Sequence, residues 1–256
     1  RGLRAVDGVA VALLVTAIAA AGPTWSKQAS PWCTETAPLV VAIEVSDSMR
    51  SNDFQPTRLD RARFKVMDLV AARTGSRTAL IAYAGSAHIV VPPSTDPEVL
   101  QPFLESLDPA IMPTPGAAAD KVLPLATTLL GDQSAGGTLL FVNDGFDSGD
   151  VAPLSAFSSQ PGSPALAALV VGTDDGGVAL LPDGSPVMAD GGGRLDTSID
   201  VSLLRRVASE AGVSVVRAST GDTDVRQLAR TIQSNLRLAD DPDAEWRDQG
   251  WWLLWP

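Results

Sequence analysis

The chain of 256 residues is poor in cysteine, histidine and basic side chains. Cys33 is its one cysteine, so neither a disulfide framework nor a cysteine-based zinc site can form within a single chain. Lys and Arg number 19 against 30 Asp and Glu, a net charge of -11. This balance argues against a nucleic-acid-binding surface, which needs basic patches.

Sequence patterns of several enzyme classes are missing as well. His88 is the one histidine and no serine lies in a G-x-S-x-G sequence, so a hydrolase triad has little support. The G-x-G-x-x-G and P-loop patterns of phosphate-binding loops are both absent. We interpret His88 as a strand residue with local hydrogen-bond partners.

The most apolar segments lie at the two ends of the chain. Residues 9–22 have the length of a signal-peptide core or a buried helix, whereas 3–25 reaches spanning length but includes Asp7. The C-terminal WWLLW resembles an interfacial aromatic belt that opens a further span. A signal peptide is the alternative for the first segment. We expect a membrane segment at 1–25, a linker at 26–37, an acidic tether at 238–250 and the start of a second membrane segment at 251–256.

Between these ends, strand patterns alternate with helix patterns. This order predicts an α/β sandwich of three layers, with a mostly parallel central sheet and one antiparallel edge strand at 87–91. A Gly- and Asp-rich hairpin insertion is expected at 172–197. The other predicted strands are 39–43, 77–83, 136–142, 165–171 and 213–217, and the predicted helices are 57–72, 96–107, 116–130, 201–210 and 223–236, with a short one following Asp150.

The central segment is PLVVAIEVSDSMR, in which an apolar run ends on an acid and two hydroxyls. Such a run without alternation is typical of a parallel strand that is buried on both faces. Glu44, Ser46 and Ser48 fall two apart, so an extended chain points all three the same way. Oxygen groups at the carboxyl end of a strand suit Mg²⁺ before Ca²⁺ or Mn²⁺. The alternative is an ordinary helix N-cap.

This E-x-S-x-S segment resembles the D-x-S-x-S element of von Willebrand factor A (VWA) domains. In PTPGAAADKVLPLA, Thr114 looks like the family's metal-binding threonine, and GTLLFVNDGFDSGD ends a strand in Asp144-Gly145, similar to the family's closing strand–Asp–Gly element. The resemblance covers about 38–237. SRTALIAYAGSAHIVVPPSTD, LDPAIMP and VVGTDDGGVAL look closest to membrane-anchored VWA proteins of the bacterial Bat or MoxR-associated type.

The resemblance implies a site for Mg²⁺, or Mn²⁺ or Ca²⁺. Its ligands would be Glu44, Ser46, Ser48, Thr114 and Asp144. We interpret Asp147 and Asp150 as helix caps or solvated acids, with a place near the metal as the alternative. One departure matters, because Glu44 stands where the family has Asp. The longer side chain enters space that an octahedral Mg²⁺ and its waters would take, and so shifts, weakens or removes the site.

The function implied is binding rather than catalysis, in a bacterial inner-membrane protein. The basic residues Arg1 and Arg4 before the first apolar segment weakly favour a periplasmic domain. An acidic residue of a protein partner would complete the coordination of the metal. The partners implied are MoxR-type AAA+ ATPases and other VWA or tetratricopeptide-repeat proteins. Two alternatives are open: a Mg²⁺-dependent hydrolase or phosphoryl-transfer enzyme with Glu44 as base and Asp144 as ligand, and a structural VWA domain with a degenerate metal site.

Overall fold

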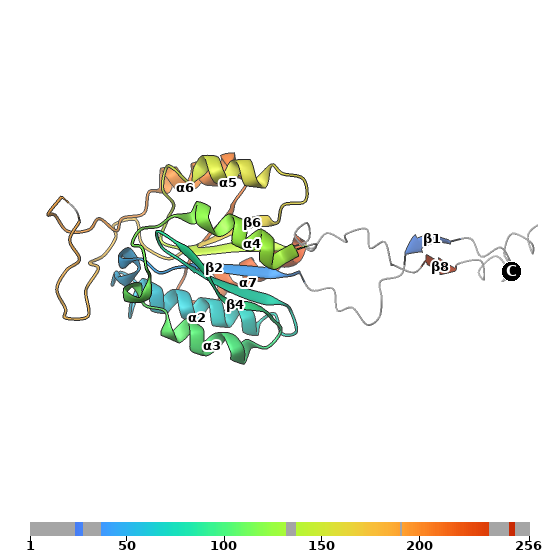
Figure 1. Ribbon diagram of the computed structural model, residues 1–256, viewed down its shortest axis with the longest axis horizontal. Helices are drawn as coiled ribbons and strands as arrows, with labels where there is room; N and C mark the ends of the chain where they lie inside the picture. Colours follow the sequence, from blue (N-terminus) through green and yellow to red (C-terminus); the bar gives the residue numbers. More distant parts are fainter. Residues whose placement is uncertain (1–23, 28–36, 132–136, 190, 236–245, 249–256) are drawn as a thin grey trace, which may run out of the picture. The chain divides into compact units, whose positions relative to one another are not determined.

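The computed structural model describes residues 24–27, 37–131, 137–189, 191–235 and 246–248 (Figure 1). The chain divides into two units, of which the larger is 36–239. None of the helices in these described ranges is long and apolar enough to cross a membrane. The predicted membrane segments lie almost entirely outside the described residues, so they stay predictions.

The smaller unit combines both ends of the chain, 1–35 and 240–256. Its described part is one antiparallel pair, β1 (Thr24–Lys27) with β8 (Trp246–Asp248). No strand was predicted at either position, where we expected the end of a membrane segment, a linker and a tether. Two short segments that pair across almost the whole chain carry no local periodicity, which is why the sequence does not reveal them.

A six-stranded sheet forms the middle of the larger unit, in the order β4-β3-β2-β5-β6-β7. Five strands are parallel, and β4 pairs antiparallel with β3 at one edge. This confirms the predicted mixed sheet with one antiparallel edge strand. The strands are β2 (Leu39–Glu44), β3 (Thr78–Tyr83), β4 (Ala87–Ser94), β5 (Thr138–Asn143), β6 (Ala165–Val170) and β7 (Ser214–Arg217).

Helices cover both faces of the sheet (Figure 1). On one face α2 (Arg58–Ala71), α3 (Pro97–Ser106) and α7 (Thr223–Ser234) pack against Leu39, Val41 and Ile43 of β2. On the other, α4 (Val122–Leu130), α5 (Val151–Ser158) and α6 (Val201–Glu210) pack against Val40 and Ala42. Every residue of β2 is therefore buried, which explains its unbroken apolar run. The described residues also form three short 3₁₀ helices: η1 (Asp47–Arg50), η2 (Pro109–Ile111) and η3 (Ala119–Lys121).

Helix α2 corrects one prediction. The apolar pattern of this helix predicts a buried side with Leu59, Phe64, Val66, Met67 and Val70, and a solvated face with Arg58, Arg61 and Asp68. Leu59, Val66 and Val70 are buried and Met67 packs against the core as predicted, but Phe64 is 58% exposed and the Arg58 side chain has no exposed surface. Apolar periodicity missed this because the partners of Arg58 are acids and a carbonyl supplied from elsewhere in the chain. The predicted helix at 116–130 also differs, since α4 proper begins at Val122 after η3.

A buried ion pair joins α2 to α7. Lys65 Nζ lies 2.8 Å from Asp224 Oδ1, and both side chains are almost fully buried. Asp224 also accepts hydrogen bonds from the backbone N–H groups of Ser219 and Val225. Burial by itself raises the pKa of Asp224, but the hydrogen bond from Lys65 and these N–H groups outweigh it and leave that pKa below its usual value.

We expect Asp224→Asn to lower the free energy of unfolding by about 3–5 kcal/mol at neutral pH, because it leaves Lys65 buried without its anionic partner. The lowered pKa means that the stabilisation is present above about pH 4 and is lost as the pH falls through the folded-state pKa. Urea unfolding of wild type and variant at neutral and acidic pH measures both effects. Asp222→Asn, at the exposed start of α7, is the control. Equal losses for the two substitutions would contradict this role of the ion pair.

Candidate functional site

The candidate site lies where two neighbouring parallel strands end. Glu44 is the last residue of β2, and Asp144 directly follows β5. The register pairs Ile43 with Val142, so the two acids leave the sheet at the same edge. Ser46 and Ser48 lie at the start of η1, immediately beyond β2. Ligands of open α/β sheets bind in this position, beyond the carboxyl ends of the strands.

Glu44 and the two serines form one chain of hydrogen bonds. Ser46 Oγ donates to Glu44 Oε1 at 2.6 Å, and the Oγ atoms of Ser46 and Ser48 are 2.8 Å apart. Tyr83 Oη donates to Glu44 Oε2 over 3.4 Å. The residue Glu44 is only 1% exposed. The predicted convergence of these three side chains is therefore present, but as a closed hydrogen-bonded group below the surface.

The Glu44 carboxyl has no basic partner among the described residues. Burial raises its pKa well above the usual value, and the charges of Asp144, Asp147 and Asp150 raise it further, while the hydrogen bond from Ser46 opposes them. A carboxyl in this environment favours its neutral form. A hard cation binds the carboxylate, so it would have to displace the proton from this group.

Asp144 does have a basic partner, Arg58, at the first residue of α2. Arg58 Nη1 lies 2.8 Å from Asp144 Oδ2, while Nε and Nη2 each donate to a carboxylate oxygen of Asp53 at 2.7 Å. Nη2 also donates to the carbonyl oxygen of Thr197 at 2.6 Å. Burial raises the pKa of Asp144, and the Arg58 charge and a hydrogen bond from Ser48 partly oppose that rise. Sequence reasoning missed both Arg58 and Asp53.

Thr114 is not joined to the other four predicted ligands by any contact that the described residues show. It is exposed, and its carbonyl oxygen accepts a hydrogen bond from Gly85 N–H at 3.0 Å. A Cβ on Gly85 would approach Pro115 O to 2.2 Å, so this close contact needs glycine. Ala117, three residues after Thr114, lines a cavity together with Glu44, Ser48 and Asp144. It offers no oxygen from its side chain.

Two cavities open around Ser48. One, of about 340 Å³, also contacts Glu44 and Asp144, and reaches the 172–199 segment at Asp196 and Ser198. The other, of about 300 Å³, has Ser46 and Ser48 among its polar lining residues. Its apolar lining residues are Val45, Pro109, Met112, Pro115, Ala117 and Leu195.

Two further acids, Asp147 and Asp150, lie near the site, which is the alternative to their interpretation as caps or solvated acids. Asp147 lines both cavities around Ser48, and its N–H donates to Asp150 Oδ2 at 2.8 Å. Asp150 is almost fully buried, and burial raises its pKa to about 6. No Lys or Arg in the described part of the chain pairs with either acid.

Comparison with known proteins identifies the domain. Residues 39–146 match the model of the von Willebrand factor type A domain. The chain contains a VWA domain. BatB of Bacteroides thetaiotaomicron shares the fold with a TM-score of 0.71 and 22% identity, covering 78% of this chain and 98% of that one. An aerotolerance-related membrane protein of Bacteroides fragilis gives 0.68 and 23%, with the same coverage.

A sequence relative is the UPF0353 protein of Mycobacterium tuberculosis. It is 25% identical over 239 residues, which cover 88% of this chain and 67% of the relative. The match is longer than the VWA model alone and reaches toward both ends of the chain.

The side chains of this VWA domain do not fit the divalent ion that its family resemblance implies. Glu44 is buried and hydrogen-bonded to Ser46 and Tyr83, and one oxygen of Asp144 is held by Arg58. Ala117 offers no side-chain oxygen beside Ser48, which leaves the two serine hydroxyls and the other Asp144 oxygen, with Asp147 on the cavity wall. In the described residues, no three His, Cys, Asp or Glu side chains are grouped to hold a metal ion. Mg²⁺ needs near-ideal octahedral geometry, and a carboxylate shared with a buried arginine works against it.

The raised pKa of Asp150 predicts a specific pH dependence. A group whose folded-state pKa is raised to about 6 stabilises the fold below its unfolded value of about 4, and this contribution is lost as the pH rises through 6. We therefore expect wild type to lose stability relative to Asp150→Asn between about pH 4 and about pH 7. Urea unfolding across this range measures the difference. Asp68→Asn, on α2 across the sheet, is the control; a pH-independent difference for Asp150→Asn would contradict the prediction.

Proposed function

We propose that this VWA domain is a protein-binding module that docks its partner on the loop face, meaning residues 44–51, 109–120, 144–150 and 172–199. The observation that carries the proposal is the pair of cavities around Ser48, one with largely apolar walls and one with acidic walls. A partner side chain with an apolar stem and a polar end matches such walls.

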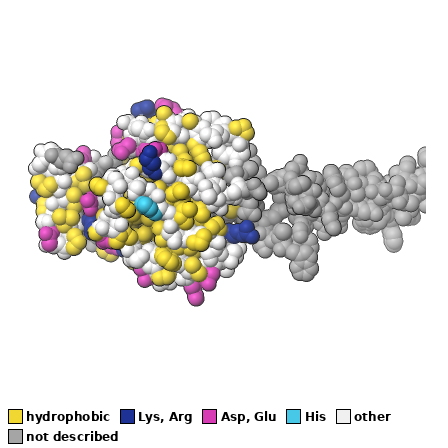
Figure 2. Space-filling view, viewed as in Figure 1, with side chains coloured by type: hydrophobic (Ala, Val, Ile, Leu, Met, Phe, Trp, Pro, Cys, Tyr) yellow, Lys and Arg dark blue, Asp and Glu magenta, His cyan; other side chains and the backbone are white. Residues whose placement is uncertain are grey.

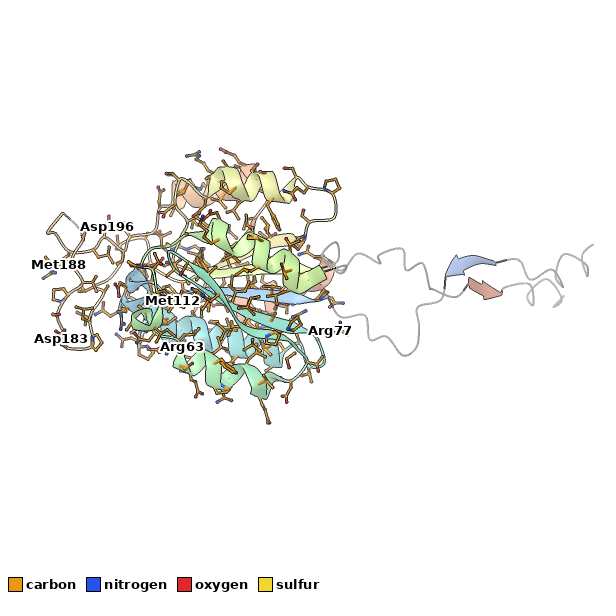
Figure 3. All side chains as sticks on the ribbon, in the orientation of Figure 1. Arg63, Arg77, Met112, Asp183, Met188 and Asp196 are labelled. Carbon is orange, nitrogen blue, oxygen red and sulfur yellow. The ribbon has the colours of Figure 1, made fainter. Side chains whose placement is uncertain are left out.

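Exposed apolar side chains lie on two parts of the loop face. Ile111, between the cavity-lining residues Pro109 and Met112, is 58% exposed, and Met188 on the 172–199 segment is 55% exposed. This segment projects beyond the end of the sheet, with Met188 and Asp183 far from the strands and Met112 close to them (Figure 3). Hydrophobic side chains gather on its surface at the left of Figure 2. Exposed apolar groups rimmed by polar ones are typical of protein-interaction surfaces.

The charge of the loop face favours a basic partner. Asp147 and Asp196 line its cavities and have no basic partner among the described residues. An acidic partner residue, which the sequence suggested, would need a metal ion to overcome this charge, and the donors do not fit one. A partner that presents lysine or arginine is complementary to the face without a metal.

Binding is favoured over catalysis by the position of Glu44. The hydrolase alternative requires it as a base, yet it is buried and hydrogen-bonded to Ser46 and Tyr83. The one histidine, His88, lies on β4 next to Ser86 and not on the loop face. Glu44 lines one cavity, but both of its carboxyl oxygens already accept hydrogen bonds, and His88 lines neither cavity around Ser48.

The cellular setting is part of the same proposal. The similar Bacteroides fragilis protein is described as an aerotolerance-related membrane protein, and apolar segments at both ends of this chain support a membrane-anchored role here too. We propose a bacterial inner-membrane location with the VWA domain in the periplasm. A MoxR-type AAA+ ATPase system, with other VWA or tetratricopeptide-repeat proteins, is the partner set that the family resemblance suggests.

The docking surface is tested with the double variant Ile111→Ser/Met188→Ser on the full-length chain, in binding to purified candidate partners. We expect affinity to fall by about 30-fold or more, because exposed apolar anchors at an interface contribute roughly 1–2 kcal/mol each when truncated. The matched control is Phe64→Ser/Phe103→Ser, two exposed aromatic side chains on α2 and α3. A loss caused by the control and not by the loop-face variant would place the partner on the helices instead.

A further inference from the structure

We infer that the guanidinium of Arg58, by pairing with Asp53 and Asp144, fastens the 172–199 segment to the sheet at the acidic end of this VWA domain, so that the order of this segment is independent of any metal ion. The inference goes beyond the proposed function, because it assigns a role to Arg58, Asp53 and Gly172 and needs no partner.

The first support is how completely Arg58 is engaged. Its side chain has no exposed surface, and its N–H groups donate to three residues: Asp53, Asp144 and Thr197. The pair with Asp53 uses both carboxylate oxygens, the two-point geometry that fits a guanidinium and not an ammonium. A buried arginine with this many partners is held in one place.

The second support is that the backbone is shaped around this arginine. Gly172 lies two residues after the end of β6, and a Cβ there would come within 2.9 Å of Arg58 Cζ and 3.1 Å of Nη2. The next residue, Thr173, donates its N–H and its Oγ1 to Asp53 Oδ2, at 2.8 and 3.0 Å. The start of the 172–199 segment is thus built onto the Asp53–Arg58 pair.

The far end of the segment returns to the same pair. The carbonyl oxygen of Thr197 accepts from Arg58, and Thr197 Oγ1 exchanges hydrogen bonds with the backbone of Gly177 at 2.8 and 2.9 Å. Val178 N–H in turn donates to Asn52 Oδ1 at 3.0 Å. Arg58 therefore connects both ends of the segment with Asp144 at the end of β5.

The third support is the charge that a metal ion would meet. Arg58 Nη1 is 2.8 Å from the Asp144 oxygen, so a divalent cation at this carboxylate would have a buried like charge beside it. Ala117 offers no hydroxyl to offset the repulsion. Arg58, a cation of the chain itself, already balances the charge of the Asp144 carboxylate.

Two measurements on the full-length chain test this inference. Thermal unfolding is followed in EDTA, in Mg²⁺ and in Mn²⁺, and we expect coincident curves, because an ion that does not bind the native state adds no stability. Hydrogen exchange of the 172–199 amides is compared for wild type, Arg58→Met and Asp53→Asn, with Arg61→Met as the control on the same helix. Asp53→Asn keeps the shape of the acid, and it is the variant to measure if Arg58→Met does not fold.

We expect faster exchange across 172–199 in Arg58→Met and Asp53→Asn. Arg61→Met should exchange like wild type, because the Arg61 side chain donates to the carbonyl oxygen of Gln55 and not to the segment. A rise in the wild-type melting temperature with Mg²⁺ or Mn²⁺ would overturn the inference. Unchanged exchange in a folded Arg58→Met or Asp53→Asn variant would overturn it as well. Neither result bears on partner docking, which is measured separately with the Ile111 and Met188 variant.

Discussion

The buried contact between Arg58 and its two acids is the constraint on which the loop face depends. Parallel strands that end together bring Asp144 to the same edge as Glu44, and without a cation Asp144 and Asp53 would be largely buried acids with no basic partner. The first residue of α2 supplies the cation, and burial makes its removal costly. Helix α2, strand β5 and the 172–199 segment are thereby fixed to one another through a single side chain.

Much of the fold could be predicted from the sequence because its strands and helices follow from patterns of neighbouring residues. The unbroken run from Leu39 to Ile43 indicated a strand covered on both faces, and both helical layers are there. The spacing of Glu44, Ser46 and Ser48 indicated side chains that converge, and they form one hydrogen-bonded group. In each case the information lies within a few neighbouring residues.

What the sequence did not reveal depends on distant partners. Arg58 meets Asp144 across 86 positions and Thr197 across 139, so helical periodicity placed it in solvent. The same limit applies to Thr114, which the family resemblance suggested as the metal-binding threonine. The path of the chain brings Ala117 to the cavity instead, and no rule of residue chemistry selects an alanine as the neighbour of a polar site.

These long-range contacts change the expected chemistry of the partner. A metal ion completed by an acidic partner residue requires free carboxylates and hydroxyls, whereas here one acid is paired with Arg58 and the other is buried and hydrogen-bonded to Ser46 and Tyr83. What remains is an acidic, partly apolar face with a projecting segment at its side. Such a face is complementary to basic and apolar groups of another protein.

The most direct test of this account is calorimetric titration of a purified partner with the full-length wild-type chain, once in EDTA and once in Mg²⁺. The account predicts the same dissociation constant in both, with affinity that weakens as salt is added, because the attraction is between acidic and basic side chains. Binding that disappears in EDTA and returns with Mg²⁺ would contradict it.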